Sequence, residues 1–161
     1  MPDEHTPATR DAIFGWLFVA AQFVLLGLLG FEAWRAVSLP GLRTVGGLAV
    51  LGGAAILSWG SFGLGRELRT HPAPSATALL RVDGAYRFVR HPIYSGLLLL
   101  AAGLALSAAS VLAVAEWMAL LTLLTQKARF EERLLSQRFE GYLEYASRTP
   151  RFVPRTTRHP R

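Results

Sequence analysis

The chain has 161 residues, of which 52% are hydrophobic and only 17% charged, and its mean hydropathy is +0.32. This is more apolar surface than a soluble domain of this size can bury, which indicates an integral membrane protein. The absence of cysteine excludes disulfides, thiolate nucleophiles and cysteine-ligated metals, and the four histidines are too scattered for a metal-binding motif. The net charge of +6 is carried almost entirely by arginines that flank apolar segments, which points to anionic lipid headgroups and not to nucleic acid.

The first two apolar segments, residues 12–31 and 44–65, are each long enough to cross a bilayer, for which about 20 residues are needed. Pro40 and Gly41, in the connector between them, indicate a turn. The second segment is rich in glycine, with Gly46, Gly47, Gly52, Gly53, Gly60, Gly63 and Gly65. Small residues let membrane helices approach closely, so we interpret these glycines as a helix-packing surface and not as a nucleotide-binding loop.

A polar loop, residues 66–92, leads to two shorter apolar segments at residues 93–106 and 111–125. Pro72 and Pro74 argue against a continuous helix through the first half of the loop. Only four small residues separate the two apolar segments, which predicts a tight helical hairpin. The second helix of the hairpin should continue well past the apolar segment, because no helix-breaking residue follows it for about four turns.

These segments predict one all-α domain over residues 1–161, a multi-pass membrane bundle of about four transmembrane helices with a C-terminal helical hairpin that extends into the cytoplasm. The distribution of Lys and Arg predicts its orientation. Five of these residues lie in the 66–92 loop and nine from Lys127 onward, against two in the first connector. By the positive-inside rule the loop and the tail are cytoplasmic, and with four spans both termini are too. We therefore expect the protein in the cell membrane.

Residues 84–96, GAYRFVRHPIYSG, concentrate charged and aromatic side chains directly before the third apolar segment. Pro92 fits the first turn of a helix, where its missing N–H needs no partner. The N-terminus of such a helix carries a partial positive charge, and Arg87, Arg90 and His91 strengthen its preference for a carboxylate or a phosphate. A basic anchor at the membrane surface is the plainer explanation of the same residues.

Two adjacent acids, Glu131 and Glu132, follow the fourth apolar segment on the side of the membrane where the Arg-His-Pro stretch also emerges. Lys127 precedes Glu131 by four residues and Arg129 precedes Glu132 by three, so each acid has a basic neighbour on its own helix face, as ordinary surface ion pairs would. Adjacent helical residues point about 100° apart, so one acid could face an internal pocket while the other supports it. Because the hairpin returns to the same side, we expect the acids to lie near His91.

Taken together, these motifs resemble the isoprenylcysteine carboxyl methyltransferase family, and phospholipid N-methyltransferases share the Arg-His-Pro and Glu-Glu elements. The resemblance covers residues 80–155: the Arg-His-Pro-x-Tyr-x-Gly segment, the apolar hairpin, and the Glu-Glu pair with the aromatic residues after it. It implies a membrane-embedded methyltransferase that uses S-adenosylmethionine and has no Rossmann domain. The residues that fall on the family motif, and to which it implies cofactor-binding roles, are His91, Pro92, Tyr94, Gly96, Glu131 and Glu132.

The chemistry of this cofactor suits the residues. Arg90 and His91 at a helix N-terminus could receive its carboxylate, and Glu131 could bind its ammonium or its ribose hydroxyls. Glu131 together with Lys127 or Arg129 could instead orient the methyl acceptor, so these three residues are the catalytic candidates. The acceptor is lipophilic or small, and a lipid amine, a carboxylate and a thiol all stay open.

Two other functions fit parts of the same pattern. Steroid-reductase-like membrane oxidoreductases carry a similar Arg-His-Pro-x-Tyr-x-Gly segment and would use NADPH, although the Glu-Glu pair favours methyl transfer. A non-catalytic membrane subunit would use the basic residues only as anchors. Glu116, inside the fourth apolar segment, is a functional candidate by its position alone. We interpret it as a side chain that reaches the opposite membrane surface.

Overall fold

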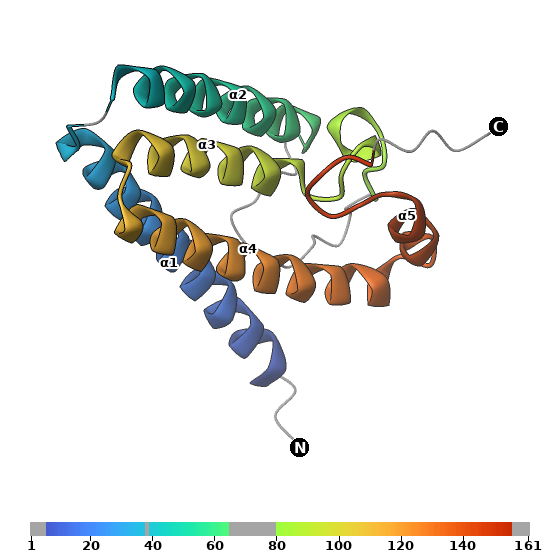
Figure 1. The fold of residues 1–161 in the computed structure, drawn as a ribbon. Helices are drawn as coiled ribbons and strands as arrows, with labels where there is room; N and C mark the ends of the chain where they lie inside the picture. Colours follow the sequence, from blue (N-terminus) through green and yellow to red (C-terminus); the bar gives the residue numbers. More distant parts are fainter. Residues whose placement is uncertain (1–5, 38, 65–79, 156–161) are drawn as a thin grey trace.

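The computed structural model describes residues 6–37, 39–64 and 80–155, and the side chains of residues 15–37, 39–63 and 80–155 among them. The first half of the polar loop, with Pro72 and Pro74, lies outside the described residues. In the described part every regular element is a helix, which confirms the all-α class (Figure 1). The elements are α1 (Thr6–Arg35), α2 (Pro40–Leu64), the 3₁₀ turn η2 (Gly84–Arg87), α3 (Pro92–Ala108), α4 (Val111–Arg138) and α5 (Tyr142–Arg148).

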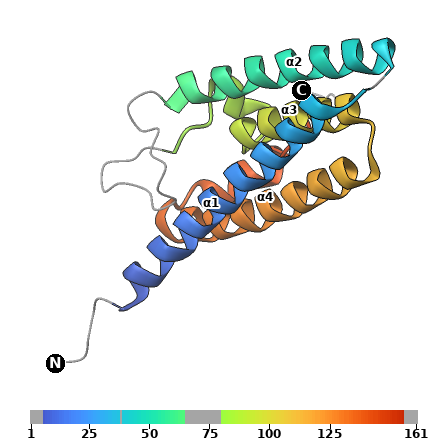
Figure 2. The ribbon, with the colours of Figure 1, turned by 90° about the vertical axis from the view of Figure 1, so that its left-hand side faces the viewer.

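The helices pack around α3. α2 lies along one side of α3, α4 returns antiparallel to α3, and α1 crosses the pair obliquely (Figures 1 and 2). The core lies where α1, α3 and α4 meet. Its fully buried side chains include Leu29 of α1, Ala101 of α3, and Leu120 and Leu124 of α4. These side chains contact neither solvent nor lipid and pack against one another.

Among the helices of the described residues, three are long and apolar enough to cross a membrane: Gly15–Arg35, Pro40–Gly63 and Val111–Arg138. Large apolar side chains such as Phe23, 63% exposed, cover their outer faces, as expected of a surface that contacts lipid. α3 has 17 residues, or about 26 Å, less than the roughly 30 Å of a bilayer's hydrocarbon core. The membrane character of the bundle is therefore supported by three helices, and a fourth full crossing stays a prediction.

The helices extend beyond the apolar segments that predicted them. α2 begins at Pro40, so the prediction of a turn at Pro40 and Gly41 is wrong. The physical reason is that proline is favoured in the first turn of a helix, and here the Thr44 hydroxyl also donates to the Pro40 carbonyl (3.0 Å). α4 continues without a break to Arg138, as the sequence predicted.

Three of the α2 glycines, Gly46, Gly53 and Gly60, pack directly on α3, as expected for close helix contact. A Cβ atom placed on Gly53 would lie 2.4 Å from the Leu100 nitrogen and 2.6 Å from the Gly96 carbonyl oxygen. A Cβ on Gly46 would lie 2.6 Å from the carbonyl oxygen of Gly103, which faces it from α3. No residue with a side chain fits between backbones this close, so the glycines determine the distance between α2 and α3.

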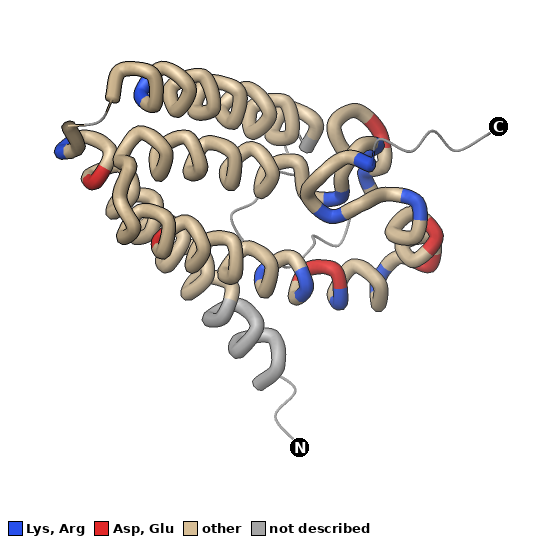
Figure 3. The backbone as a smooth tube through the Cα atoms, in the orientation of Figure 1, with Lys and Arg blue, Asp and Glu red and all other residues tan. Residues whose placement is uncertain are grey.

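A two-residue turn joins α3 to α4. Ala109 takes a left-handed conformation (φ 50°), and the Ser110 hydroxyl caps α4 by accepting a hydrogen bond from the Ala113 nitrogen (3.0 Å). Because the turn is short, the beginning of α3 and the end of α4 lie at the same end of the bundle. Most of the charged residues of the described part gather at that end (Figure 3).

Candidate active site

The Arg-His-Pro stretch forms the beginning of α3. Pro92 lies in the first turn, as predicted, and His91 occupies the N-cap position directly before it. The His91 side chain is only 8% exposed, and its ring stacks on the Tyr94 ring with centroids 5.3 Å apart and an angle of 2° between the planes. The histidine is thus held in one orientation by the helix that follows it.

The C-terminal tail folds back onto this helix start. The Arg90 nitrogen donates to the Pro150 carbonyl (2.8 Å), and the His91 nitrogen donates to the Arg151 carbonyl (3.1 Å). The Phe152 ring lies 6.1 Å from the His91 ring. The tail therefore provides hydrogen-bond partners for backbone groups that the start of α3 would otherwise leave unpaired.

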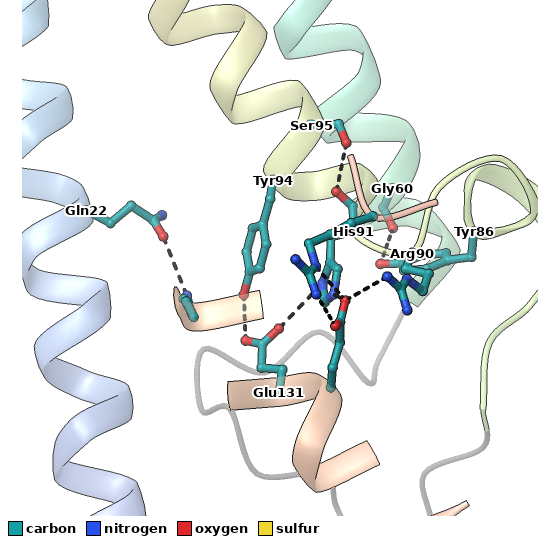
Figure 4. A network of polar contacts seen from close by, with 11 residues as sticks. Gln22, Gly60, Tyr86, Arg90, His91, Tyr94, Ser95 and Glu131 are labelled. Atoms are coloured by element: carbon teal, nitrogen blue, oxygen red, sulfur yellow. Dashed lines mark hydrogen bonds and ion pairs between the residues drawn. The ribbon is translucent and has the colours of Figure 1, made fainter. Parts of the chain in front are cut away.

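His91 lies between the two carboxylates of α4. Its Nε2 is 3.1 Å from Oε1 of Glu132, and its Nδ1 is 3.7 Å from Oε2 of Glu131 (Figure 4). The Tyr94 hydroxyl donates to Oε1 of Glu131 at 2.5 Å. The two motifs, about 40 residues apart in the sequence, therefore meet at one end of the hairpin, as its expected topology required.

The two acids have different partners. Glu132 accepts two hydrogen bonds from the Arg151 guanidinium (2.9 and 2.6 Å) and has the Nη2 atom of Arg90 at 3.4 Å. The hydrogen bonds with Glu132 raise the pKa of Arg151, so this guanidinium is a permanent positive charge. Within the described part of the chain, Glu131 has only the hydrogen bond from the Tyr94 hydroxyl and the longer contact with His91. Glu132 is thus committed to the protein's own cations, whereas Glu131 retains capacity for a ligand.

The two basic candidates of α4 lie in different places. Lys127 is only 7% exposed, and its Nζ atom lies 5.1 Å from the centre of the Tyr94 ring and 3.5 Å from the Gln22 side-chain oxygen on α1. Arg129 is exposed, and no interaction among the described residues joins it to either acid. Lys127 therefore adjoins the site and Arg129 lies outside it.

Gly96 has a packing role. A Cβ atom at this position would lie 2.5 Å from the Leu57 nitrogen and 2.7 Å from the Gly53 carbonyl oxygen, both in the backbone of α2. The residue therefore faces α2 and not the acids of α4.

The match to a family model covers most of this site. The model for phospholipid methyltransferases matches residues 42–141, more than half of the chain. The chain belongs to the phospholipid methyltransferase family. It is also 36% identical over 152 residues to the cobalt-zinc-cadmium resistance protein CzcN of Cupriavidus metallidurans. That match covers 91% of this chain and 65% of CzcN, so the chain spans less than two thirds of the relative's length.

In this member of the phospholipid methyltransferase family, three polar residues at the site come from outside the matched range: Gln22 of α1, Tyr142 of α5 and Arg151 of the tail. The sequence motifs contained neither Gln22 nor Arg151. Gln22 could have been singled out from the sequence, since it is the one strongly polar residue in the apolar segment 12–31. Nothing in the sequence singles out Arg151, because it is one of nine lysines and arginines from Lys127 onward.

The site keeps two buried donor atoms with no partner among the described residues: Nε of Arg90 and the hydroxyl of Tyr142. Burial raises the pKa of Tyr142 to about 12, so its hydroxyl keeps its proton at neutral pH. Buried donors of this kind are costly unless something accepts their hydrogen bonds. Together with the carboxylate of Glu131, they suit a ligand that carries both an anionic and a cationic group.

Proposed function

We propose that this protein is an S-adenosylmethionine-dependent methyltransferase that acts at the cytoplasmic membrane face on a lipophilic or small acceptor, similarly to isoprenylcysteine carboxyl methyltransferases. Membership of the phospholipid methyltransferase family supports methyl transfer. The observation that carries the proposal is the position of His91, held between Glu131 and Glu132 at the start of α3.

The donors and acceptors of the site fit the amino-acid part of S-adenosylmethionine. Arg90 and Tyr142 offer buried donors for its carboxylate, and the helix start at Pro92 favours the same charge. Glu131 would bind the ammonium or the ribose hydroxyls. Glu132 does not bind the cofactor directly in this proposal, because Arg151 and His91 already occupy its oxygens.

When bound, the cofactor supplies an electrophilic methyl group for an in-line displacement, a reaction that depends mainly on alignment and on exclusion of water. The residues of the chain provide both conditions. Glu132 and Arg151 hold His91 in place, and Tyr94 fixes the carboxylate of Glu131. The apolar helices around Lys127 keep water from the acceptor side of the site.

We further propose that this end of the bundle faces the cytoplasm of the cell and that both termini are cytoplasmic. The concentration of basic residues at this end supports the orientation (Figure 3). The cofactor would then enter from the cytoplasm, and a lipophilic acceptor from the bilayer.

Calorimetry on the purified protein in detergent tests the proposal, with S-adenosylmethionine and NADPH as alternative ligands. We expect the wild type to bind S-adenosylmethionine and not NADPH. Glu131→Gln and His91→Ala should each weaken binding about tenfold or more, since a hydrogen bond to a charged group is worth about 1.5–3 kcal/mol. Arg133→Gln is the matched control, because Arg133 lies on the same helix but its side chain is exposed and packs over Phe130 (5.8 Å).

A wild type that binds NADPH and not S-adenosylmethionine would replace the methyltransferase with an oxidoreductase, and one that binds neither would favour a non-catalytic subunit. Wild-type affinity in both site variants would remove His91 and Glu131 from the cofactor site. Circular dichroism of each variant shows whether it is folded. Incubation with methyl-labelled cofactor and a native membrane extract would then identify the labelled acceptor.

A further inference from the structure

Lys127 is a buried ammonium group with too few hydrogen-bond acceptors. Its side chain is 7% exposed, and a lysine ammonium has three N–H donors. Among the described residues it has one hydrogen-bond partner, the side-chain oxygen of Gln22 at the long distance of 3.5 Å. The Tyr94 ring face at 5.1 Å adds a cation–π contact but no acceptor atom. A buried cation with so few hydrogen-bond partners costs free energy, and a bound anion that accepted its hydrogen bonds would reduce this cost.

The nearby acid attracts Lys127 but does not pair with it. Glu131 lies one helical turn beyond Lys127 and acts on the ammonium electrostatically. No ion pair joins the two among the described residues, since Oε1 of Glu131 accepts the Tyr94 hydroxyl and its Oε2 faces His91. The carboxylate is thus held at the hydroxyl end of the tyrosine. Figure 4 shows Gln22 on one side of the Tyr94 ring, His91 on the other, and Glu131 at the hydroxyl end of Tyr94.

The side chain of Gln22 adds hydrogen-bond donors next to Lys127. Its side-chain oxygen is used by Lys127, and this is the one hydrogen bond of its amide group among the described residues, so both amide N–H donors remain. Gln22 itself is half-buried, and the outer surface of the same helix is apolar, with Phe23 and Val24 63% and 61% exposed. The amide donors are therefore not sealed inside the bundle, and an amphiphile in the bilayer could approach them.

We propose that Lys127 and Gln22 form an oxyanion-binding subsite that holds a carboxylate or phosphate of the methyl acceptor, on the α1 side of Tyr94. The subsite rests on the proposed methyltransferase function. It belongs to the acceptor and not to the cofactor for two reasons. The cofactor's carboxylate already has donors at Arg90 and Tyr142, and an ammonium group repels a sulfonium, whereas it attracts an anionic acceptor. The acceptor is then an amphiphile with an oxyanion close to its reacting group.

Binding of single-chain amphiphiles to the full-length protein in dodecyl maltoside tests the subsite without any turnover. The probes are dodecyl phosphate, dodecanoate and, as the cationic control, dodecyltrimethylammonium, each followed by titration calorimetry. We expect saturable binding of one or both anionic probes and none of the cationic one, and the tighter anionic probe identifies the headgroup. Lys127→Met should lower the affinity for the tighter-binding probe about tenfold or more, because a hydrogen bond to a charged group is lost. Gln22→Leu should lower the same affinity about threefold, because a neutral hydrogen bond is lost.

Three controls separate this role from others. Lys127→Arg keeps the charge and should restore most of the anion affinity, and Arg133→Met removes an exposed charge from the same helix and should change nothing. Lys127→Met should unfold at the same temperature as the wild type or higher, because it removes a buried charge with few partners. A purely structural lysine would lower the unfolding temperature on replacement.

Equal binding of the anionic probes by wild type and Lys127→Met would overturn the subsite. So would loss of S-adenosylmethionine affinity in Lys127→Met by the same factor as the loss of anion affinity, since Lys127 would then belong to the cofactor. Failure of the wild type to bind S-adenosylmethionine would instead remove the methyltransferase proposal. The amphiphile titrations would still report on the anion site in that case, so the two failures are distinguishable.

Discussion

Replacing Gly53 with alanine should destabilise the bundle, although alanine is the better helix former. The added Cβ atom would lie 2.4 Å from the Leu100 nitrogen, 2.6 Å from the Gly96 oxygen and 2.8 Å from the Leu100 Cα. All three are backbone atoms, so no side-chain rotation relieves the contact. α2 and α3 would have to separate by about 1 Å to reach an ordinary van der Waals distance.

The magnitude follows from two opposing effects. Overpacking of a well-packed interface costs about 1–3 kcal/mol, and alanine in place of glycine within a helix contributes up to about 1 kcal/mol in the other direction. Gly47 provides the matched control, because it also lies within α2 but a Cβ there would have nothing within 4 Å. The difference in unfolding free energy between Gly53→Ala and Gly47→Ala should therefore isolate the overpacking, at about 1–3 kcal/mol.

Both variants can be unfolded with sodium dodecyl sulfate in dodecyl maltoside micelles and followed by circular dichroism. We expect Gly47→Ala to be as stable as the wild type or more so, and Gly53→Ala to unfold at a lower mole fraction of the denaturing detergent. If the two variants unfold together, the close contact between α2 and α3 does not exist in the protein.

Two further predictions concern the tail and α5. Arg151→Met removes both hydrogen bonds to Glu132, so calorimetry should show S-adenosylmethionine affinity about tenfold lower, and an unchanged affinity would contradict the role of Glu132 in holding His91. The Tyr145 hydroxyl donates to the Tyr86 carbonyl (2.6 Å), and burial raises the pKa of Tyr145 from 10.0 to about 12. Its neutral form is favoured in the folded state, so the stability that it contributes is fully present below about pH 10 and is lost as the pH rises toward 12. Unfolding measured across this range should depend less steeply on pH in Tyr145→Phe than in the wild type, and parallel curves would refute the assignment.

The meeting of the two motifs could be predicted from the sequence because it depends on topology alone. Four small residues between two apolar segments allow only a tight antiparallel return, and this brings His91 and Glu131 to one end. The choice between Lys127 and Arg129 needed more than their spacing from the acids. A signal was present: Leu120, Leu124 and Ala128 form the buried stripe of α4, and Lys127 lies beside it.

Other features could not be read from the sequence for physical reasons. Proline opens helices as readily as turns, so Pro40 alone did not determine where α2 begins. Gly96 lies within a family motif, yet its partner is the backbone around Gly53, more than 40 residues earlier in another helix. Arg151 reaches Glu132 because the tail folds back and its carbonyl accepts a hydrogen bond from the His91 nitrogen, a tertiary contact that no local sequence pattern marks.

The site owes its position to the unequal lengths of α3 and α4. α3 has 17 residues and α4 has 28, so α4 extends beyond the start of its partner by roughly 16 Å. Counted from the turn, Pro92 is level with Lys127, and Glu131 lies one helical turn further, opposite the backbone that leads into α3. Along this overhang α4 no longer has α3 beside it, and the tail with Arg151 covers this place. The chain can therefore hold charged groups at the end of an apolar hairpin. The shorter helix, α3, begins directly after Arg90 and His91, and the longer helix, α4, carries Glu131 and Glu132 beyond that point.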